Sequence, residues 1–460
     1  MEQVLEMSLY RPKPTDLVAF LPYACRQLEA PFRLRVLVET VEEYVSKTAT
    51  DVTGKKSKRD KTPQTQSSDG QYSVEPELSP AEQLVFDENE VLLCARCDRW
   101  GQPVELLFHR CQQVPRLLIK IIGLCIPYQE QLARIAVHWT PLDGAALYEL
   151  AKYLPLSQLT EISLDNSPAL HRNYHLLLEP TSRLASLSLA RCGLADEECA
   201  ALAARLAHPL PASRTLVCLA LDANRIGDAG ARALADALRT NRALRHLSLA
   251  GNAITSVGAA DILRSLGPFP VSRDEIVCKR RRTFEHLKLR MDAYARYSAK
   301  LPESTEPAAA VADAGRGRPP RTPRASATPT MVAKSSGLNA VASRAAVLGA
   351  PRPEPFDPGE LVACGDVTYC AGNFCLSSLN LAYNELDCTS ARRLADVLAY
   401  QAGARRRGGL LRVVLEGNAL PAACAGARAA EALLERALAA AERALPRPKP
   451  GRKYERPKFK

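Results

Sequence analysis

Two cysteines with metal-ligand spacing are the first candidates for chemistry in this chain. Cys94 and Cys97 are separated by two residues, and His109 and Cys111 follow downstream. Structural zinc sites normally use four ligands in two close pairs, and a pair with one residue between its members is poor geometry for such a site. We therefore expect buried thiols here rather than a metal centre, and no cofactor.

Residue types that support catalysis are present without the neighbours that they need. The chain has seven histidines, none in a recognisable Ser–His or Cys–His motif, and it has no GxxxxGK[ST] loop for a phosphate. Its 14 cysteines are scattered over 460 residues, which is typical of reduced thiols and not of a small disulfide framework. These patterns argue against an enzyme.

The elements that must position any site come from a recurring spacing, L-x-x-L-x-L-x-x-N-x-L. Its clearest copies begin at Leu216, Leu244, Leu376 and Leu410. The alternating leucines predict a short strand with one buried face, and the asparagine falls where that strand must turn. There its amide can bond to backbone groups of the turn. The asparagines expected to form this structural ladder are Asn224, Asn252, Asn384 and Asn418.

Degenerate copies extend the array, and an alanine-rich helical stretch follows the clearest strands. Three further units begin at Leu132, Leu159 and Leu184, so that five units precede a long interruption and two follow it. One unit cannot bury its apolar face alone, but stacked units bury a continuous core. These residues resemble the leucine-rich repeat of the ribonuclease-inhibitor-like type. The resemblance implies an α/β horseshoe, a curved solenoid with a parallel sheet on its concave side.

The repeats divide the chain into segments. We expect an N-terminal helical segment (1–48), a flexible basic linker (49–80), an N-terminal cap region (81–130), five repeat units (131–267), an insertion (268–366), two repeat units with a terminal helix (367–442) and a basic tail (443–460). In the first segment, Thr15 is the expected N-cap of one helix, and residues 31–45 are expected to form a second. In the insertion, we expect a charged helix over 272–301 and a proline-rich disordered stretch over 302–360.

Function in such a solenoid is expected on the concave strand positions between the leucines. In the second unit they include Thr160, and over the whole array they are small, polar and mildly acidic, without tryptophan or tyrosine anchors. The face could seat a basic segment or helix of a protein partner, be solvated, or meet the chain's own basic loop. The residues expected to contact a partner are Asp165, Ser188, Asp222, Ser248, Asn380 and Glu416.

The charge and hydropathy of the chain limit the classes of partner that we expect. The net charge of +11 is concentrated in three basic runs, at 55–61, 279–282 and the C-terminal tail. Such runs attract an acidic surface, either a microtubule or nucleic acid. No aromatic interleaving or nucleic-acid module is present, so nucleic acid is not favoured. No apolar run of about 18 residues or more indicates a membrane span, and the first residues lack a signal pattern, so we expect a cytoplasmic protein.

Two further resemblances bear on assembly. The stretch from Pro14 to Ala30 resembles the second helix of the docking-and-dimerisation domain of cAMP-dependent protein kinase regulatory subunits, which implies dimerisation or helix docking by residues 2–45. A generic helical cap is the alternative, because Pro22 falls inside that helix. The layout of five units, a charged helix at 274–282, an insert and two more units is similar to the leucine-rich repeat-containing protein 71 family. That family has ciliated-cell associations, which implies a ciliary or axonemal scaffold.

Together these observations favour a non-catalytic protein–protein interaction scaffold of the cytoplasm, cilium or axoneme, with microtubule or axonemal proteins as candidate partners. Two alternatives stay open. One is a soluble cytosolic regulatory binder that acts like ribonuclease inhibitor. The other is a nucleic-acid-associated adaptor that uses the basic segments.

Overall fold

The computed structural model of the chain describes residues 11–40, 90–109, 111–179, 182–298, 355–404, 406 and 408–444. The chain divides into two compact units, one of Met1–Phe269 with Ala371–Lys460 and one of Pro270–Cys370. The expected linker (49–80), most of the expected disordered stretch (302–360) and nearly all of the basic tail lie outside the described residues.

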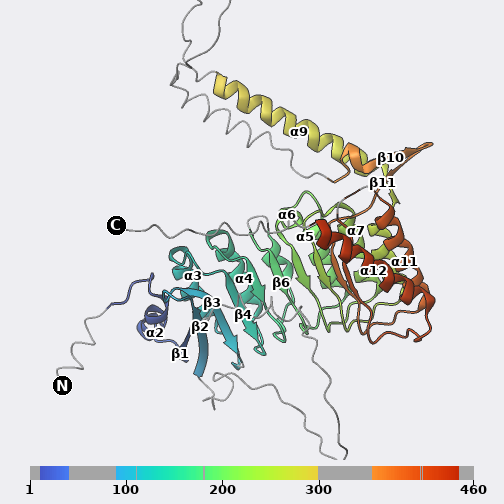
Figure 1. Cartoon of the computed structure of the whole chain (residues 1–460). Helices are drawn as coiled ribbons and strands as arrows, with labels where there is room; N and C mark the ends of the chain where they lie inside the picture. The colour runs from blue at the N-terminus through green and yellow to red at the C-terminus, as the bar shows by residue number, and fades with distance from the viewer. Residues whose placement is uncertain are drawn as a thin grey trace, which may run out of the picture. The chain divides into compact units, whose positions relative to one another are not determined.

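The first unit is built on one open sheet, in which the described strands follow one another in chain order (Figure 1). They are β1 (Arg33–Thr40), β2 (Glu90–Cys97), β3 (Pro103–His109), β4 (Arg134–His138), β5 (Glu161–Ser163), β6 (Ser186–Ser188), β7 (Cys218–Ala220), β8 (His246–Ser248), β12 (Ser378–Asn380) and β13 (Arg412–Val414). Among the described strand pairs of this sheet, only β2–β3 is antiparallel. Strand β8 pairs directly with β12, with Leu247 opposite Leu379, so the array continues across the insertion.

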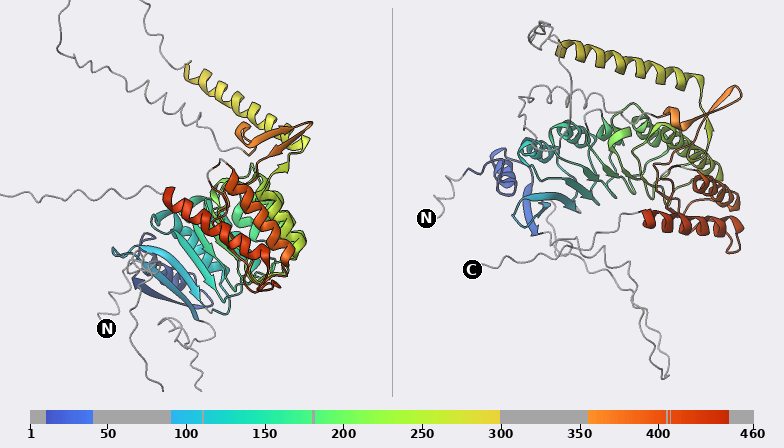
Figure 2. Two further views of the ribbon diagram at one scale, coloured as in Figure 1. Left: turned by 45° about the vertical axis from the view of Figure 1, so that its right-hand side comes forward. Right: turned by 45° about the horizontal axis from the view of Figure 1, so that its top comes forward.

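Helices join the strands and lie along one side of the sheet (Figure 2). They are α3 (Arg116–Cys125), α4 (Gly144–Tyr153), α5 (Asp196–Leu206), α6 (Ala212–Thr215), α7 (Asp228–Thr240), α8 (Ser256–Leu266), α11 (Cys388–Gly403) and α12 (Ala425–Ala444), with 3-10 turns η2 (Ile126–Tyr128), η3 (Leu154–Leu156) and η4 (Tyr174–Leu178). Alanines keep α7 slim, and a side chain at Gly258 of α8 would press on Ala231 of α7. Paired strands lie close together, so the helices that follow them must also pack closely. Small residues on the facing sides of these helices make that close packing possible.

The hydrophobic core lies between the sheet and these helices. The central leucine of each short strand points into it, as Leu187, Leu219, Leu247 and Leu379 do with at most 1% of their surface exposed. Burial of each such side chain contributes about 1.5–3 kcal/mol relative to exposure. Because these leucines align in register, strands of three residues suffice to build a continuous core.

The expected second helix at 31–45 is wrong, because residues 33–40 form strand β1. Eight residues of β1 pair in parallel register with β2, so its backbone groups are satisfied across the sheet. The alternation of Leu34 and Val36 with Arg33 and Arg35 has the period of two that a strand requires. Among the described residues, the N-terminal segment (1–48) is therefore helical only over α2 (Leu17–Gln27).

Helix α2 closes the N-terminal end of the core. Its N-cap is Asp16 and not the expected Thr15, since the Asp16 carboxylate accepts a hydrogen bond from the Ala19 amide at 3.2 Å. Its apolar side, with Leu17 and Leu21 at most 1% exposed, joins the core together with residues of α3. The buried side of α2 is therefore used for packing within the chain.

The expected cap region (81–130) also extends the sheet, because its described residues include β2, β3 and α3. Among the described residues, no helix has both the length and the hydropathy needed to cross a membrane.

The second unit contains the long helix α9 (Arg273–Ser298), the turn η5 (Pro358–Glu360) and strands β10 (Leu361–Cys364) and β11 (Val367–Cys370). A three-stranded sheet has the order β10, β11, β9 (Phe269–Pro270), and of β9 only Pro270 belongs to the second unit. Helix α9 begins with a capping box. The Ser272 hydroxyl accepts from the Glu275 amide at 3.1 Å, and the Glu275 carboxylate accepts from the Ser272 amide at 2.7 Å. The expected disordered stretch is wrong for 355–360, which are ordered and include η5.

Candidate protein-interaction face

The side of the sheet opposite the helices carries rows of side chains, one from each strand, and we call this side the open face. Strand register aligns the first row as Glu39, Arg96, Glu105, Arg134, Glu161, Ser186, Cys218, His246, Ser378 and Arg412. The second row is Leu37, Cys94, Leu107, Ala136, Ser163, Ser188, Ala220, Ser248, Asn380 and Val414. A third row lies at the carboxyl ends of the repeat strands, and it includes Asp165, Asp222 and Glu416.

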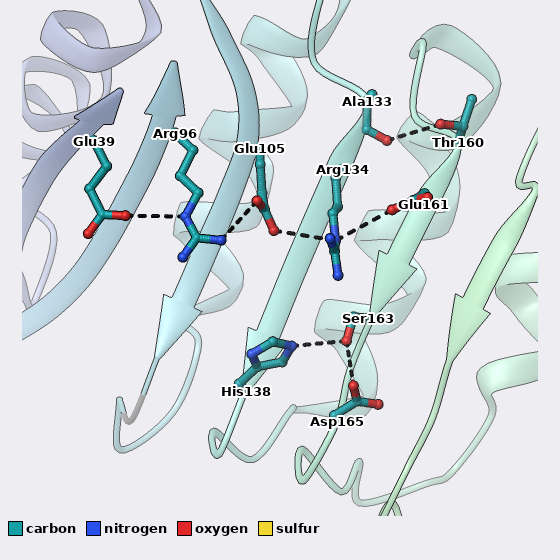
Figure 3. Close-up of polar contacts among 10 residues, drawn as sticks. All are labelled: Glu39, Arg96, Glu105, Ala133, Arg134, His138, Thr160, Glu161, Ser163 and Asp165. Carbon is teal, nitrogen blue, oxygen red and sulfur yellow. Dashed lines mark hydrogen bonds and ion pairs between the residues drawn. The ribbon is translucent and has the colours of Figure 1, made fainter. Parts of the chain in front are cut away.

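The first row begins with an alternating series of charges, which we call the charge ladder: Glu39, Arg96, Glu105, Arg134 and Glu161 (Figure 3). Arg96 lies 3.2 Å from Glu39 and 3.1 Å from Glu105. Arg134 lies 3.3 Å from Glu105 and 3.5 Å from Glu161. Opposite charges directly across neighbouring strands stabilise their pairing. The Glu105 side chain, 13% exposed and shared by both arginines, is the centre of the ladder.

Beside the charge ladder, three side chains form a hydrogen-bonded chain that resembles a catalytic triad only in its residue types. The Ser163 hydroxyl lies 2.9 Å from His138 Nε2 and 2.8 Å from the Asp165 carboxylate (Figure 3). An ionised carboxylate only accepts, so Ser163 donates to Asp165 and accepts from His138. A hydrolytic triad needs the opposite polarity, with the histidine accepting the serine proton. Burial lowers the pKa of His138, which favours the neutral imidazole, and a bond donated to Ser163 requires its proton to be on Nε2.

Asp165 and Asp222 occupy equivalent places and each fastens the following repeat. The Asp165 carboxylate accepts from the Ser188 hydroxyl at 2.6 Å and from the Ala190 amide at 3.0 Å. The Asp222 carboxylate accepts from the Ser248 hydroxyl and from the Ala250 amide at 2.9 Å. We call these two arrangements aspartate clamps. Four of the six residues that the sequence nominated for partner contact are thus bonded in pairs to one another.

The remaining two nominated residues lie farther along the open face. The Asn380 side chain accepts from the Ala382 amide at 3.1 Å, and Glu416 is exposed in the third row near the C-terminal edge. Thr160 was placed on this face wrongly, since it precedes β5 and its hydroxyl bonds to the Ala133 carbonyl (Figure 3). Its place belongs to Glu161, which is in register with Arg134.

The four ladder asparagines stitch neighbouring repeats together. Asn384, only 7% exposed, donates to the carbonyls of Leu249, Leu381 and Ala382 and accepts from the Ile254 amide at 3.2 Å. Asn224, Asn252 and Asn418 follow the same pattern, and each bonds both to backbone groups of its own repeat and to those of the preceding repeat.

Smaller side chains continue this line toward the N-terminus. The Cys192 thiol contacts the Leu164 carbonyl at 3.0 Å, and the Ser167 hydroxyl donates to the Val137 carbonyl at 2.8 Å. Thr140 accepts from the Cys111 amide at 3.1 Å. Hydroxyl and thiol groups offer fewer bonds than an amide, so these N-terminal repeats are joined by fewer side-chain bonds in this line.

Of the cysteines with metal-ligand spacing, Cys94 and Cys97 lie in β2 and Cys111 follows the end of β3. Cys94 is in the second row at 2% exposure, and burial, followed by the nearby Glu39 carboxylate, raises its pKa to about 12. Burial also raises the pKa of Cys97 and Cys111. Thiols with raised pKa values are poor nucleophiles and poor ligands at neutral pH. The described residues contain no group of three or more His, Cys, Asp or Glu side chains arranged for a metal ion.

The turn after each repeat strand contributes one further row, at a position with positive φ. Gly251 and Gly417 occupy it in two repeats, but Trp139 (φ 56°) and Tyr383 (φ 53°) occupy it in others and are 51% and 64% exposed. The left-handed conformation costs a side-chain-bearing residue about 1–2 kcal/mol. Neither aromatic and no member of the charge ladder was expected from the repeat spacing. An alignment of the residue before each ladder asparagine places Tyr383 where Gly251 and Gly417 stand.

Comparison with known families agrees with the repeats seen in the sheet. A family described as Leucine Rich repeat matches residues 212–235 and 240–263, which contain β7, β8 and parts of the helices that follow them. A search of curated proteins finds no match for the chain.

Proposed function

We propose that this leucine-rich-repeat protein is a non-catalytic scaffold that binds a protein partner on the N-terminal half of its open face. Leucine-rich repeats generally mediate protein–protein interaction. The repeats of this chain are therefore the reason to expect a protein partner. The observation that carries the proposal is the charge ladder, a row of five alternating charged side chains on the side of the sheet away from the helices. Alternating charges specify the register of a partner more than they add affinity.

Exposed apolar surface at the carboxyl end of β4, the end of the strand away from Arg134, supports the same half of the face. Trp139 follows directly on His138 at the carboxyl end of β4 and is half exposed in a backbone conformation that costs free energy. Tryptophan and arginine are the residues most often found at the energetic centres of protein interfaces. We propose Trp139, Arg96 and Arg134 as the central contacts, with Glu161 and His138 around them.

The nominated residues keep a place in this proposal. Asp165 is shared between an aspartate clamp and the edge of the proposed contact area, and Ser188 completes that clamp. Asp222, Ser248, Asn380 and Glu416 lie beyond it, toward the C-terminal edge, and would serve a second partner.

The proposal extends to architecture and location. We propose that the repeats form a ribonuclease-inhibitor-like solenoid, on the basis of strands in chain order and helices along one side. We further propose a cytoplasmic protein of the cilium or axoneme, on the basis of the layout of five units, a charged helix and two more units, with microtubule or axonemal proteins as partners.

The test is fractionation of ciliated cells that express tagged variants, with detergent followed by high salt. Wild type is expected to stay with the axoneme after detergent. Arg134→Glu combined with Trp139→Ala is expected to release it, whereas Arg412→Glu, a matched charge reversal at the far end of the first row, is expected to leave it bound. Release of the wild type by detergent alone would overturn the axonemal proposal and favour a soluble regulatory binder.

A further inference from the structure

Helix α9 exposes bulky apolar side chains along much of its length. Val277, Phe284, Leu287 and Met291 are 55%, 69%, 49% and 72% exposed. Exposed single hydrophobics are common on protein surfaces, but a contiguous group marks an interaction site.

Helical geometry places the four on one side. At about 100° per residue, Phe284, Met291 and Leu287 fall within an arc of about 80° that starts at Val277. Leu289, 68% exposed, lies about 160° around the helix from Leu287 by the same rule, and so outside the group. We call the four residues the apolar stripe of α9.

Charge is distributed around this stripe unevenly. The 26 residues of α9 carry eight Lys and Arg and four Asp and Glu, a net charge of +4. By the same 100° spacing, Arg280 lies within the arc of the stripe, Arg281 and Lys288 lie along one border and Arg290 lies beyond the other. Asp274, Glu285 and Asp292 project from a different side, about 100–120° from the middle of the stripe. An apolar stripe bordered by bases is complementary to an apolar groove bordered by acids.

Two other occupants fit less well. A second copy of α9 would bring the same basic borders against each other, and like charges across a helix pair are destabilising. An anionic membrane surface would accept the bases, but helices that lie in membranes present a wide apolar face. The stripe of α9 is narrow and holds a single aromatic residue, which suits a groove.

We propose that α9 docks, with its apolar stripe inward, into an acidic, apolar groove of a partner protein, of the kind that calcium-loaded EF-hand sensors expose. Such grooves take amphipathic helices through apolar residues spaced by three, four and seven positions, and Val277, Phe284, Leu287 and Met291 have these intervals. This inference is independent of the open face, because α9 belongs to the second compact unit.

The experiment titrates the full-length protein with calcium-loaded calmodulin as the probe and measures binding by isothermal calorimetry. Binding with a Kd on the order of micromolar or tighter is expected, and chelation of calcium should abolish it. Leu287→Glu and Met291→Glu should each weaken binding by about tenfold or more, since they place an acid within an acidic groove. Leu289→Glu is the matched control on the other side of the same helix and should change affinity by less than about twofold.

Three outcomes would overturn the proposal. They are no calcium-dependent binding by the wild type, equal losses for Leu287→Glu and Leu289→Glu, and loss of binding in the open-face variant Arg134→Glu. Circular dichroism of each variant checks that the total helix content of the chain is unchanged. Flotation with phosphatidylserine vesicles identifies the alternative surface, since vesicle binding that depends on the stripe, in a protein that ignores calmodulin, assigns α9 to a membrane.

Discussion

The two halves of the open face join their strands in different ways. Between β1 and β5, neighbouring strands share the ion pairs of the charge ladder, whose arginines are 34% and 44% exposed. From β7 to β13, the amides of the ladder asparagines join the turns, and the Asp222 clamp links β7 to β8. One backbone pattern is thus secured by partly exposed charges at one end and by largely buried amides at the other.

The buried amides and the partly exposed charges are expected to serve different purposes, the first folding and the second partner binding. A buried amide with several partners contributes to folding and offers little to a ligand, because its donors and acceptors are already used. An ion pair at a partly exposed site adds little stability, and its charges remain accessible to a partner. The C-terminal half of the sheet is therefore expected to dominate folding, and the N-terminal half to dominate binding.

The largest expected effect is from Asn384→Ala. It leaves the Ile254 amide and several carbonyls without their buried partner, and the loss of unfolding free energy should be about 2–4 kcal/mol. The equivalent Ser167→Ala, which removes fewer bonds, should cost about 1–2 kcal/mol. Urea unfolding of full-length variants measures both. Equal losses at the two positions would remove the distinction between the halves.

The charge ladder should respond more weakly and in a salt-dependent way. Glu105→Gln removes the acid that Arg96 and Arg134 share and should cost about 1 kcal/mol at low ionic strength and less at high salt. Ser378→Ala, in the same row of the C-terminal half, is the control and should change stability by less than about 0.5 kcal/mol. A loss at Glu105 that salt does not reduce would argue against an electrostatic role.

Replacing Trp139 by glycine should raise stability slightly while abolishing partner retention. Glycine removes the cost of the positive φ angle, which stabilises the folded state, but it also adds backbone entropy to the unfolded chain. The free energy of unfolding should therefore rise by only about 0.5 kcal/mol. Tyr383→Gly should show no such gain, because the Tyr383 ring packs against Gly417 of the next repeat. Thermal unfolding compares the two, and a destabilised Trp139→Gly would mean that the indole serves the fold.

The smallest expected effect is a pH dependence from His138. Burial lowers the pKa of His138 below its ordinary value of 6.5. As the pH falls through 6.5, the unfolded state therefore takes up a proton at His138 before the folded state does. Stability should therefore fall as the pH drops below about 6.5 and be insensitive to this group above it. Urea midpoints at pH 7.5 and 5.0 measure the slope. His138→Gln should flatten it, and an unchanged slope would assign it to another group.

Much of the sheet could be predicted from one sequence because the repeat is local. Each of the seven expected units supplies a strand, and the leucines expected in the core are buried except in the last unit, where Leu415 and Leu420 are only partly buried. The error at β1 has a physical cause, since a short apolar and charged stretch fits a helix or a strand until a neighbouring strand is known. Asp165 and Ser188 were nominated from spacing alone, but spacing could not show that they bond to each other.

The spacing of leucines and asparagines by itself determined the order of strands, the buried side of each and the positions of the ladder asparagines, because these follow from contacts a few residues apart or one repeat away. Only the tertiary structure decided which charges meet. Glu39 and Arg96 are 57 residues apart, and β8 meets β12 across the whole insertion. Such pairs depend on strand register, which packing over the whole sheet sets and no local pattern encodes.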